Sequence, residues 1–293
     1  MYNQKAIFHL PGLFSHFDLY LEILHNYQVN PDMFKENVVI GSIYDSPPCI
    51  WNGGRLVLGY QLKKDELENV KNAMEAYGVP ARFTFTNCLL EEHHAYDTYG
   101  NLILKIFNNG NNEIICNTEV LENYIREKYG NDYKYISSTT KRLGKDKSKQ
   151  LEELEKDYHL IVLDYDYNKN FDFLNSIQNK EQCEILCNAV CPANCPYRAH
   201  HYKQISQFQL DFDDNVPDWC QYHTQDALFV SKGRESFISP EDINDIYLPM
   251  GFNNFKLEGR TTTNAELIEI LLYYLIKEEY QSEVRYYLNK TFS

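Results

Sequence analysis

The sequence lacks several features that would assign it to a broad class of proteins. It has no run of about 18 apolar residues, the length that a membrane-spanning helix needs, so we expect no membrane span. Its first residues, MYNQKAIFHLPG, lack the charged and then apolar order of a secretory leader. Basic residues number 28 against 42 acidic ones, which argues against general binding to nucleic acid or to an anionic membrane surface. These absences predict a cytoplasmic protein.

The eight cysteines of this chain are expected to be thiols rather than half-cystines. Without a leader, the chain is expected in a reducing compartment, where cysteines bind metal, catalyse or fill the core. Four of them have no close cysteine partner in the sequence: Cys49, Cys88, Cys116 and Cys183. We expect these four to be small buried residues, although Cys88 and Cys116 could still approach a site from their strands.

Short β-branched or aromatic runs alternate with helical patterns eight times along the 293 residues. The predicted strands are 5–10, 38–44, 81–87, 112–117, 133–140, 159–167, 183–189 and 253–260. Eight strand–helix pairs in this length are typical of an α/β protein with a (β/α)8 TIM-like barrel, a single domain over 1–293. An open doubly wound sheet is the alternative, but the chain lacks the glycine-rich nucleotide turn of that fold.

Three helical patterns have definite expected limits. The pattern over 63–78 should end at Gly78, because glycine accepts the left-handed conformation that often closes a helix. The patterns over 89–110 and 264–288 are each expected to be one continuous helix. The second of these is long enough to pack along the outside of a barrel.

The densest chemical signal is the stretch 183–201, CEILCNAVCPANCPYRAHH. Cys187, Cys191 and Cys195 follow one another at four-residue intervals, and Cys220 comes 25 residues later, within an excursion (187–250) between the last two strands. Thiolates gather in this way to hold soft metals. Even spacing in a proline-containing loop favours a 4Fe–4S cluster over zinc, which prefers paired C-x2-C arms. A zinc site and unliganded thiols stay open as alternatives.

Polar side chains are expected where the barrel strands end, on the face that carries the active site in this fold. The candidate substrate-binding residues are Arg55, Asn87, Asn117, Ser138, Thr139, Lys141, Asp164 and Asn188. Arg55 lies in the loop WNGGRL, where two glycines either let the backbone approach a ligand or form a surface hairpin. The Asn, Ser and Thr residues have an alternative role as caps of the helices that follow.

Glu258 and Arg260 lie two residues apart near the end of the last predicted strand, so they point to the same side. Asn254 and Lys256 share that side, whereas Phe255 lies on the other. Unpaired charges facing the apolar helix layer would be costly, so the polar side should point into the barrel. We therefore predict that Glu258 and Arg260 are catalytic residues at its mouth. A structural ion pair is the alternative.

Residues 183–195 and the segment MGFNNFKLEGR (250–260) resemble the collagenase-like (U32) peptidase family. That family includes bacterial barrel proteins for oxygen-independent hydroxylation of ubiquinone precursors and of RNA, which carry a cysteine-ligated 4Fe–4S cluster. Its strand Phe-Lys-Ile-Glu-Gly-Arg corresponds to FKLEGR (255–260) here. The resemblance implies the barrel, the cluster and a role for Glu258 and Arg260. It does not imply peptidase activity.

Together these features predict an iron–sulfur protein of anaerobic metabolism. It would be a redox or hydroxylation-type enzyme for a small molecule or a nucleic-acid base, working with an electron donor or a related partner subunit. The alternative is a non-enzymatic partner protein that a cluster or a zinc ion stabilises. A metal-independent hydrolase is disfavoured, because no Ser–His or Cys–His pair can be read from the spacing.

Overall fold

The computed structural model describes residues 4–143, 147–215 and 227–292. Its eight strands form one closed barrel in the order of the sequence, β1 to β8. Neighbouring strands run parallel, as in the pairs β3 with β4 and β7 with β8. The α/β fold with a (β/α)8 TIM-like barrel that the sequence predicts is therefore confirmed. No helix of the described ranges is long and apolar enough to cross a membrane.

Each strand overlaps a predicted one. Their bounds are β1 Ala6–Pro11, β2 Val38–Asp45, β3 Ala81–Phe85, β4 Glu113–Cys116, β5 Lys134–Ser137, β6 Leu160–Val162, β7 Cys183–Leu186 and β8 Asn254–Lys256. Most strand residues are buried whichever side they face, as expected for parallel strands covered on both faces.

The chain forms α1 Phe17–Val29, α2 Lys64–Tyr77, α3 Thr98–Phe107, α4 Glu119–Tyr129, α5 Lys147–Leu154, α6 Phe171–Ser176, α7 Arg198–Asp211, α8 Ala227–Lys232, α9 Pro240–Asp242, α10 Leu248–Met250, α11 Asn264–Leu275 and α12 Glu278–Phe292. One α-helix follows each of β1 to β6, whereas α7 to α10 follow β7 and α11 and α12 follow β8. Gly78 ends α2 with φ of 67°, as predicted.

Internal contacts divide the chain into two compact units. Unit 1 comprises Met1–Ile43, Tyr165–Ala193 and Tyr222–Ser293. Unit 2 comprises Tyr44–Asp164 and Asn194–Gln221. Unit 1 therefore contains β1, most of β2, β7 and β8, and unit 2 contains β3 to β6.

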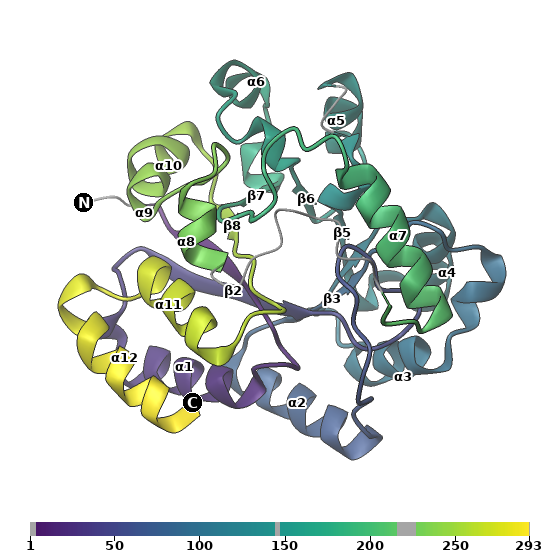
Figure 1. Ribbon diagram of the computed structural model, residues 1–293, viewed down its shortest axis with the longest axis horizontal. Helices are drawn as coiled ribbons and strands as arrows, with labels where there is room; N and C mark the ends of the chain where they lie inside the picture. Colours follow the sequence, from purple (N-terminus) through teal and green to yellow (C-terminus); the bar gives the residue numbers. More distant parts are fainter. Residues whose placement is uncertain (1–3, 144–146, 216–226, 293) are drawn as a thin grey trace. The chain divides into compact units, whose positions relative to one another are not determined.

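The core of unit 1 lies between its strands and α11. Phe8 of β1 contacts Phe255 of β8 and Tyr274 of α11, each with 6.0 Å between ring centroids. Burial of a side chain of this size stabilises the fold by about 1.5–3 kcal/mol. Helices α12 (yellow) and α1 (purple) lie side by side (Figure 1), and Tyr287 of α12 donates a hydrogen bond to Glu22 of α1.

The core of unit 2 includes the loop after β2. Trp51 is fully buried, and its ring meets that of Phe85 of β3 edge to face, with 5.0 Å between the centroids. A Cβ at Gly100 of α3 would lie 2.5 Å from the Trp51 ring, so α3 packs this closely because residue 100 has no side chain. This contact fixes the loop that leads to Gly53, Gly54 and Arg55.

Two predicted helices are each broken once. The 264–288 pattern is interrupted at Ile276, which is extended and pairs with Phe34 in a β-bridge. Lys277 also donates its backbone N–H to Met33, so the backbone bonds that would continue α11 are used elsewhere. The 89–110 pattern forms a short 3₁₀ helix, Glu92–Tyr96, and then α3, because the Asp97 carboxylate caps the backbone N–H of Gly100.

Candidate functional site

Polar residues after three strands of unit 2 come together, as the sequence predicts for strand ends. The Asn117 amide, after β4, donates a hydrogen bond of 2.8 Å to the Thr140 hydroxyl. The hydroxyls of Ser138 and Thr140, after β5, lie 2.7 Å apart. Thr86, after β3, is near the same place, because a Cβ at Gly54 would contact both Thr86 and Thr140. We call Thr86, Asn117, Ser138 and Thr140 the strand-end cluster.

The WNGGRL loop packs against this cluster. A Cβ at Gly53 would lie 2.4 Å from the carbonyl oxygen of Thr86. The absence of a side chain at Gly53 therefore lets the loop pack directly against the end of β3. The Thr86 hydroxyl donates to the Gly53 carbonyl oxygen at 2.6 Å. Gly54 has φ of 74°, which favours glycine there. The partly buried Arg55 donates to the carbonyl oxygen of Gly54 at 2.9 Å, so its guanidinium contacts its own loop.

Asp164, after β6, is held between two arginines that were not among the predicted site residues. Its Oδ2 lies 2.9 Å from Nη1 of Arg142, and its Oδ1 lies 3.1 Å from Nη1 of Arg198. Asp164 and Arg198 are 1% and 2% exposed, and Arg142 is partly buried. The two arginines are far apart in the sequence, and no spacing rule connects them to Asp164.

Lys141 belongs to a different group of charges. Its ammonium donates to the Glu153 carboxylate at 2.8 Å and to the Tyr158 hydroxyl at 2.9 Å. Burial alone would raise the pKa of Glu153, but hydrogen bonds from Lys141, Lys156 and Ser137 lower that pKa to about 2. Lys141 thus ties the turn after β5 to α5, and its contact with substrate stays a prediction.

Asn87 is fully buried and uses its amide group on the backbone. Its Nδ2 donates to the carbonyl oxygens of Ile50 and Ser206 at 2.8 and 3.0 Å. Its Oδ1 accepts from the N–H of Leu89 at 2.9 Å. Asn87 therefore joins the strand end to α7, which is a structural role.

The interior of unit 1 contains a buried ionic network. His9 lies 2.8 Å from Ser42 through Nδ1, and its Nε2 lies 3.1 Å from Asn254 and 3.5 Å from the Glu184 carboxylate. The Lys256 ammonium lies 3.4 Å from the other oxygen of Glu184. Spacing could not reveal the Ser42–His9 pair, since 33 residues separate the two. Because Ser42, His9 and Glu184 are at most 3% exposed, we interpret the network as the polar core of unit 1.

The polar side of β8 points into the barrel, as predicted. Asn254 and Lys256 are in register with Ile7 and His9 of β1, whereas Phe255 is in register with Phe8, which faces α11. The strand itself ends at Lys256, earlier than predicted, because the Asn188 side chain forms hydrogen bonds with both the backbone N–H and the carbonyl oxygen of Glu258. Asn188 is thereby a link between the chain after β7 and the chain after β8.

Glu258 and Arg260 follow β8 and are both partly exposed. The Glu258 carboxylate accepts a hydrogen bond from the N–H of Val190 at 3.2 Å, which holds the loop after β7. The Arg260 carbonyl oxygen accepts a hydrogen bond from the Ser15 hydroxyl. Their position beyond the strand end agrees with the predicted mouth, and their catalytic roles stay predictions.

The described cysteines of the predicted cluster are buried or partly buried. Cys187 is fully buried and directs its thiol to the carbonyl oxygen of Ile185, at 3.7 Å. Burial, with a contribution from Glu184, raises the pKa of the Cys187 thiol well above its ordinary value. Cys191 packs against Tyr165, Leu186 and Ala189. No three His, Cys, Asp or Glu residues of 4–143, 147–215 and 227–292 form a metal-binding group, and Cys220 lies outside those ranges.

The other cysteines are mostly small core residues, as expected. Cys49, Cys116 and Cys183 are buried, and Cys88 is half-buried with its sulfur 3.4 Å from the Ser206 hydroxyl. Burial, opposed by the nearby Lys180, raises the pKa of Cys183 to about 12. Burial also raises the pKa of Cys49 and Cys116, so these two thiols and Cys183 are protonated at neutral pH, which suits packing rather than metal binding.

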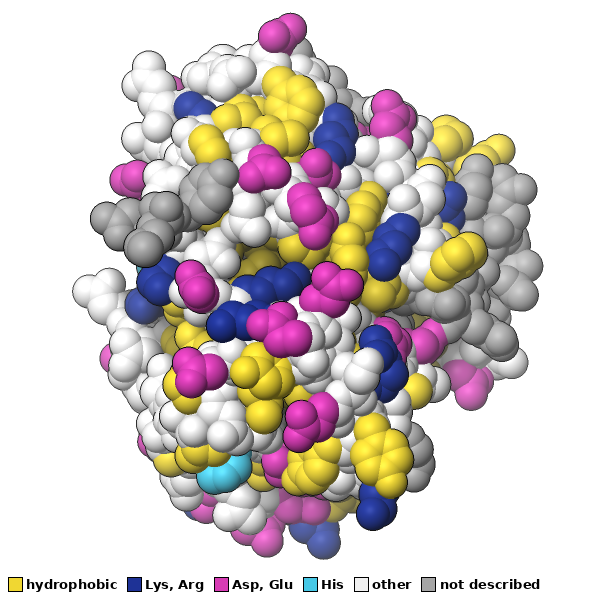
Figure 2. Space-filling view, turned by 90° about the vertical axis from the view of Figure 1, so that its left-hand side faces the viewer, with side chains coloured by type: hydrophobic (Ala, Val, Ile, Leu, Met, Phe, Trp, Pro, Cys, Tyr) yellow, Lys and Arg dark blue, Asp and Glu magenta, His cyan; other side chains and the backbone are white. Residues whose placement is uncertain are grey.

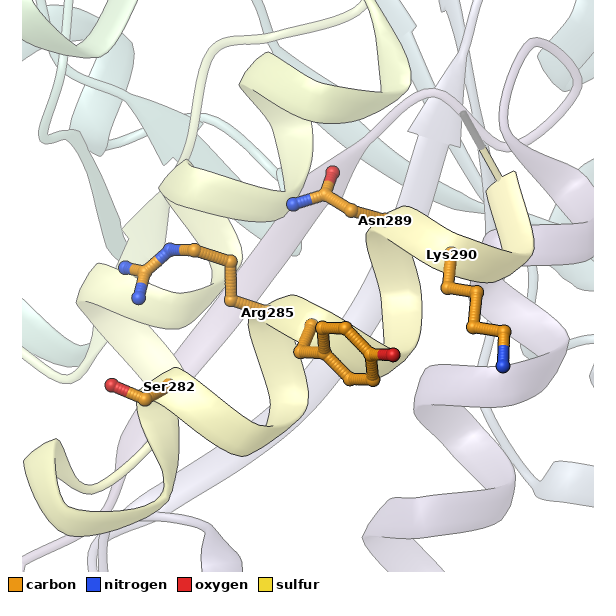
Figure 3. Close-up of a pocket in the computed structure, with 5 residues that line it drawn as sticks. Ser282, Arg285, Asn289 and Lys290 are labelled. Carbon is orange, nitrogen blue, oxygen red and sulfur yellow. The ribbon is translucent and has the colours of Figure 1, made fainter.

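A hollow lies on α12 of unit 1. Figure 3 shows Ser282, Arg285, Asn289 and Lys290 along this helix, and the Arg285 guanidinium is held by two hydrogen bonds to Glu269. None of the predicted site residues lines this hollow. On the face drawn in Figure 2, basic side chains near the centre are interspersed with acidic ones, so that face presents no broad area of one sign.

Comparison of the sequence with protein-family models and with curated proteins found no match. Comparison of the structures found the U32 peptidase Mk0906, with a TM-score of 0.51 and 14% sequence identity, over 87% of this chain and 93% of that one. The spore cortex-lytic enzyme SleL of Bacillus cereus matches over 92% of this chain and 74% of that one, with 10% identity and a TM-score of 0.39, too low to indicate a shared fold. The likeness to Mk0906 supports the U32 resemblance at the level of the fold.

Proposed function

We propose that this chain is a barrel enzyme that binds a small polar substrate at the strand-end cluster of unit 2. The observation that supports this function is the hydrogen-bonded set of Asn117, Ser138 and Thr140, in which Asn117 and Thr140 are partly exposed. In barrels of this class, active sites lie at the carboxyl ends of the strands.

The chemistry of the cluster suits recognition of hydroxyl, amide or oxyanion groups. An Asn amide both donates and accepts hydrogen bonds, and Ser and Thr hydroxyls rotate to do either. The side chains come from separate strand ends held by the barrel, so their relative positions are fixed before a ligand arrives. Such preorganisation lowers the cost of binding.

Iron–sulfur chemistry, in a redox or hydroxylation reaction, is our more specific hypothesis for this enzyme. It is supported by the spacing of Cys187, Cys191, Cys195 and Cys220 and by the resemblance of 183–195 and 250–260 to the U32 family. It is opposed by the burial of the Cys187 thiol, which raises the pKa of that thiol well above its ordinary value. We therefore assign no catalytic step to a cluster.

Metal analysis of protein purified without oxygen tests this hypothesis. If a 4Fe–4S cluster is present, we expect about four iron and four sulfide per chain and an absorption band at about 400 nm that bleaches in air. Cys191→Ala should remove most of the iron, while the control Cys88→Ala, which changes a thiol outside the predicted set, should keep it. Iron below about one per chain would reject the cluster, and about one zinc per chain would support a zinc site instead.

Turnover tests the proposed enzymatic activity itself. Purified protein is incubated, with and without oxygen, in an extract of small metabolites, and mass spectrometry follows every compound. We expect one polar compound to be consumed while one product appears, at a rate proportional to the protein concentration. An extract that stays unchanged under both conditions would contradict the proposal.

A further inference from the structure

The turn that holds part of the strand-end cluster also carries Arg142. Ser138 begins the short 3₁₀ helix Thr139–Lys141, and its hydroxyl accepts a hydrogen bond from the N–H of Thr140. Arg142 closes this turn in the left-handed conformation, with φ of 60°, and its N–H donates to the Thr139 carbonyl oxygen. The Arg142 side chain therefore starts beside the proposed substrate site.

Asp164 fixes the direction of two guanidinium groups at this place. It accepts hydrogen bonds from Nη1 of Arg142 at 2.9 Å and from Nη1 of Arg198 at 3.1 Å. A guanidinium has five N–H donors in a rigid plane, and it binds carboxylates and phosphates in a defined geometry. Arg198, the first residue of α7, is 2% exposed, so its orientation is set by packing as well as by Asp164.

Two neutral side chains add hydrogen-bond donors nearby. The Thr139 hydroxyl and the Nε2 group of Gln150 are buried, and neither has a hydrogen-bond partner within the described part of the chain. Gln150 is 1% exposed, and its Oε1 accepts from the N–H of Asp164 at 3.4 Å, so its amide lies beside the arginine pair. Buried donors without acceptors are unfavourable, and a ligand with several oxygens would relieve that cost.

We propose that Arg142 and Arg198 form a subsite for an anionic group, a carboxylate or a phosphate, of the molecule that the strand-end cluster binds. The Arg142 and Arg198 guanidinium groups bind the anion, with Thr139 and Gln150 as additional donors, and Asp164 holds the two arginines in position. This inference rests on the proposed function, because it names the substrate class of the same site. It applies only to small molecules, since the two arginines are mostly covered by the protein.

Isothermal titration of the full chain at low ionic strength tests the subsite. The probes are inorganic phosphate and malonate, which distinguish the two anion classes, and malonamide, the neutral counterpart of malonate. Wild type should bind at least one anion and not malonamide. Arg142→Gln should weaken anion binding by about tenfold or more, and Arg142→Lys, which keeps the charge, by less. Arg285→Gln is the matched control, because it removes the same charge from α12, and its affinity should equal that of wild type.

Two results of the titration would overturn the inference. One is binding of neither anion by the wild type, and the other is equal anion affinity for wild type and a folded Arg142→Gln. A neutral substrate whose conversion depends on Asn117 but not on Arg142 would also refute the anionic subsite, while the proposed function would stand. Conversely, Arg142-dependent anion binding in a protein that converts no metabolite would keep the subsite and remove the enzymatic proposal.

Discussion

Glu184 shows how single residues stabilise the interior of unit 1. Its side chain is fully buried, and its two oxygens lie 3.5 Å from His9 Nε2 and 3.4 Å from Lys256 Nζ. Lys256 would lose this carboxylate if residue 184 were neutral. A buried charge that loses its partner is strongly destabilising, whereas an exposed pair contributes little.

Glu184→Ala is therefore expected to lower the free energy of unfolding by about 3–5 kcal/mol, as for other broken buried pairs. Urea denaturation followed by circular dichroism measures this change. The matched control is Glu269→Ala, whose partner Arg285 is on the partly exposed surface of α12, and its cost should be about 1 kcal/mol or less. Equal costs for the two variants would show that the interior network does not stabilise the barrel.

Part of the candidate site could be predicted residue by residue. Asn117 and Ser138 come together because the carboxyl ends of neighbouring parallel strands meet, which the strand pattern already implies. Asn87 and Lys141 follow strands too, but their partners Ser206 and Glu153 come from helices whose docking the pattern does not reveal. The Arg142–Asp164–Arg198 group was missed for the same reason.

At the scale of elements, the strands were easier to predict than the helix ends. A buried strand shows itself as a local apolar run, so all eight overlap their predicted ranges. The break between α11 and α12 depends instead on Phe34, which pairs with Ile276 from a distant part of the chain. The early end of β8 depends likewise on the Asn188 side chain. Long-range partners of this kind leave no local pattern.

Helix α7 can test whether side-chain hydrogen bonds are needed to dock a helix against the loop after β2. Gln209 on this helix is fully buried, and its amide bonds the carbonyl oxygens of Cys49 and Val57 and the N–H of Val57, at 2.8–2.9 Å. These bonds fasten the loop after β2 to α7 in unit 2. Without the side chain, buried backbone groups of the loop would lose their partners.

Gln209→Ala should accordingly reduce the free energy of unfolding by about 2–4 kcal/mol, since each unsatisfied buried group costs about 1–3 kcal/mol. Chemical denaturation again gives the value. The control is Gln207→Ala on the same helix, an exposed residue that bonds Asp211, and its effect should be within about 0.5 kcal/mol. A Gln209→Ala protein as stable as the control would mean that packing alone docks the helix.

At the scale of the whole molecule, eight local alternations were enough to predict the closed barrel. The division into two units depends on contacts between remote segments, such as Met1–Ile43 with Tyr222–Ser293, and no composition change marks it. The sequence predicted the fold more directly than it predicted the functional site. The cysteine spacing suggested one site, while the described side chains gather at another, the strand-end cluster of unit 2.

The measurement that tests this location most directly is the rate of metabolite conversion by three proteins: wild type, Asn117→Ala and Asn131→Ala. Asn117 bonds Thr140 within the cluster, whereas Asn131 is exposed on the turn after α4 and serves as the control. We predict that Asn117→Ala lowers the rate by about tenfold or more, the effect of losing roughly one hydrogen bond to substrate, while Asn131→Ala keeps it. Equal rates for all three proteins would contradict a substrate site at the strand-end cluster.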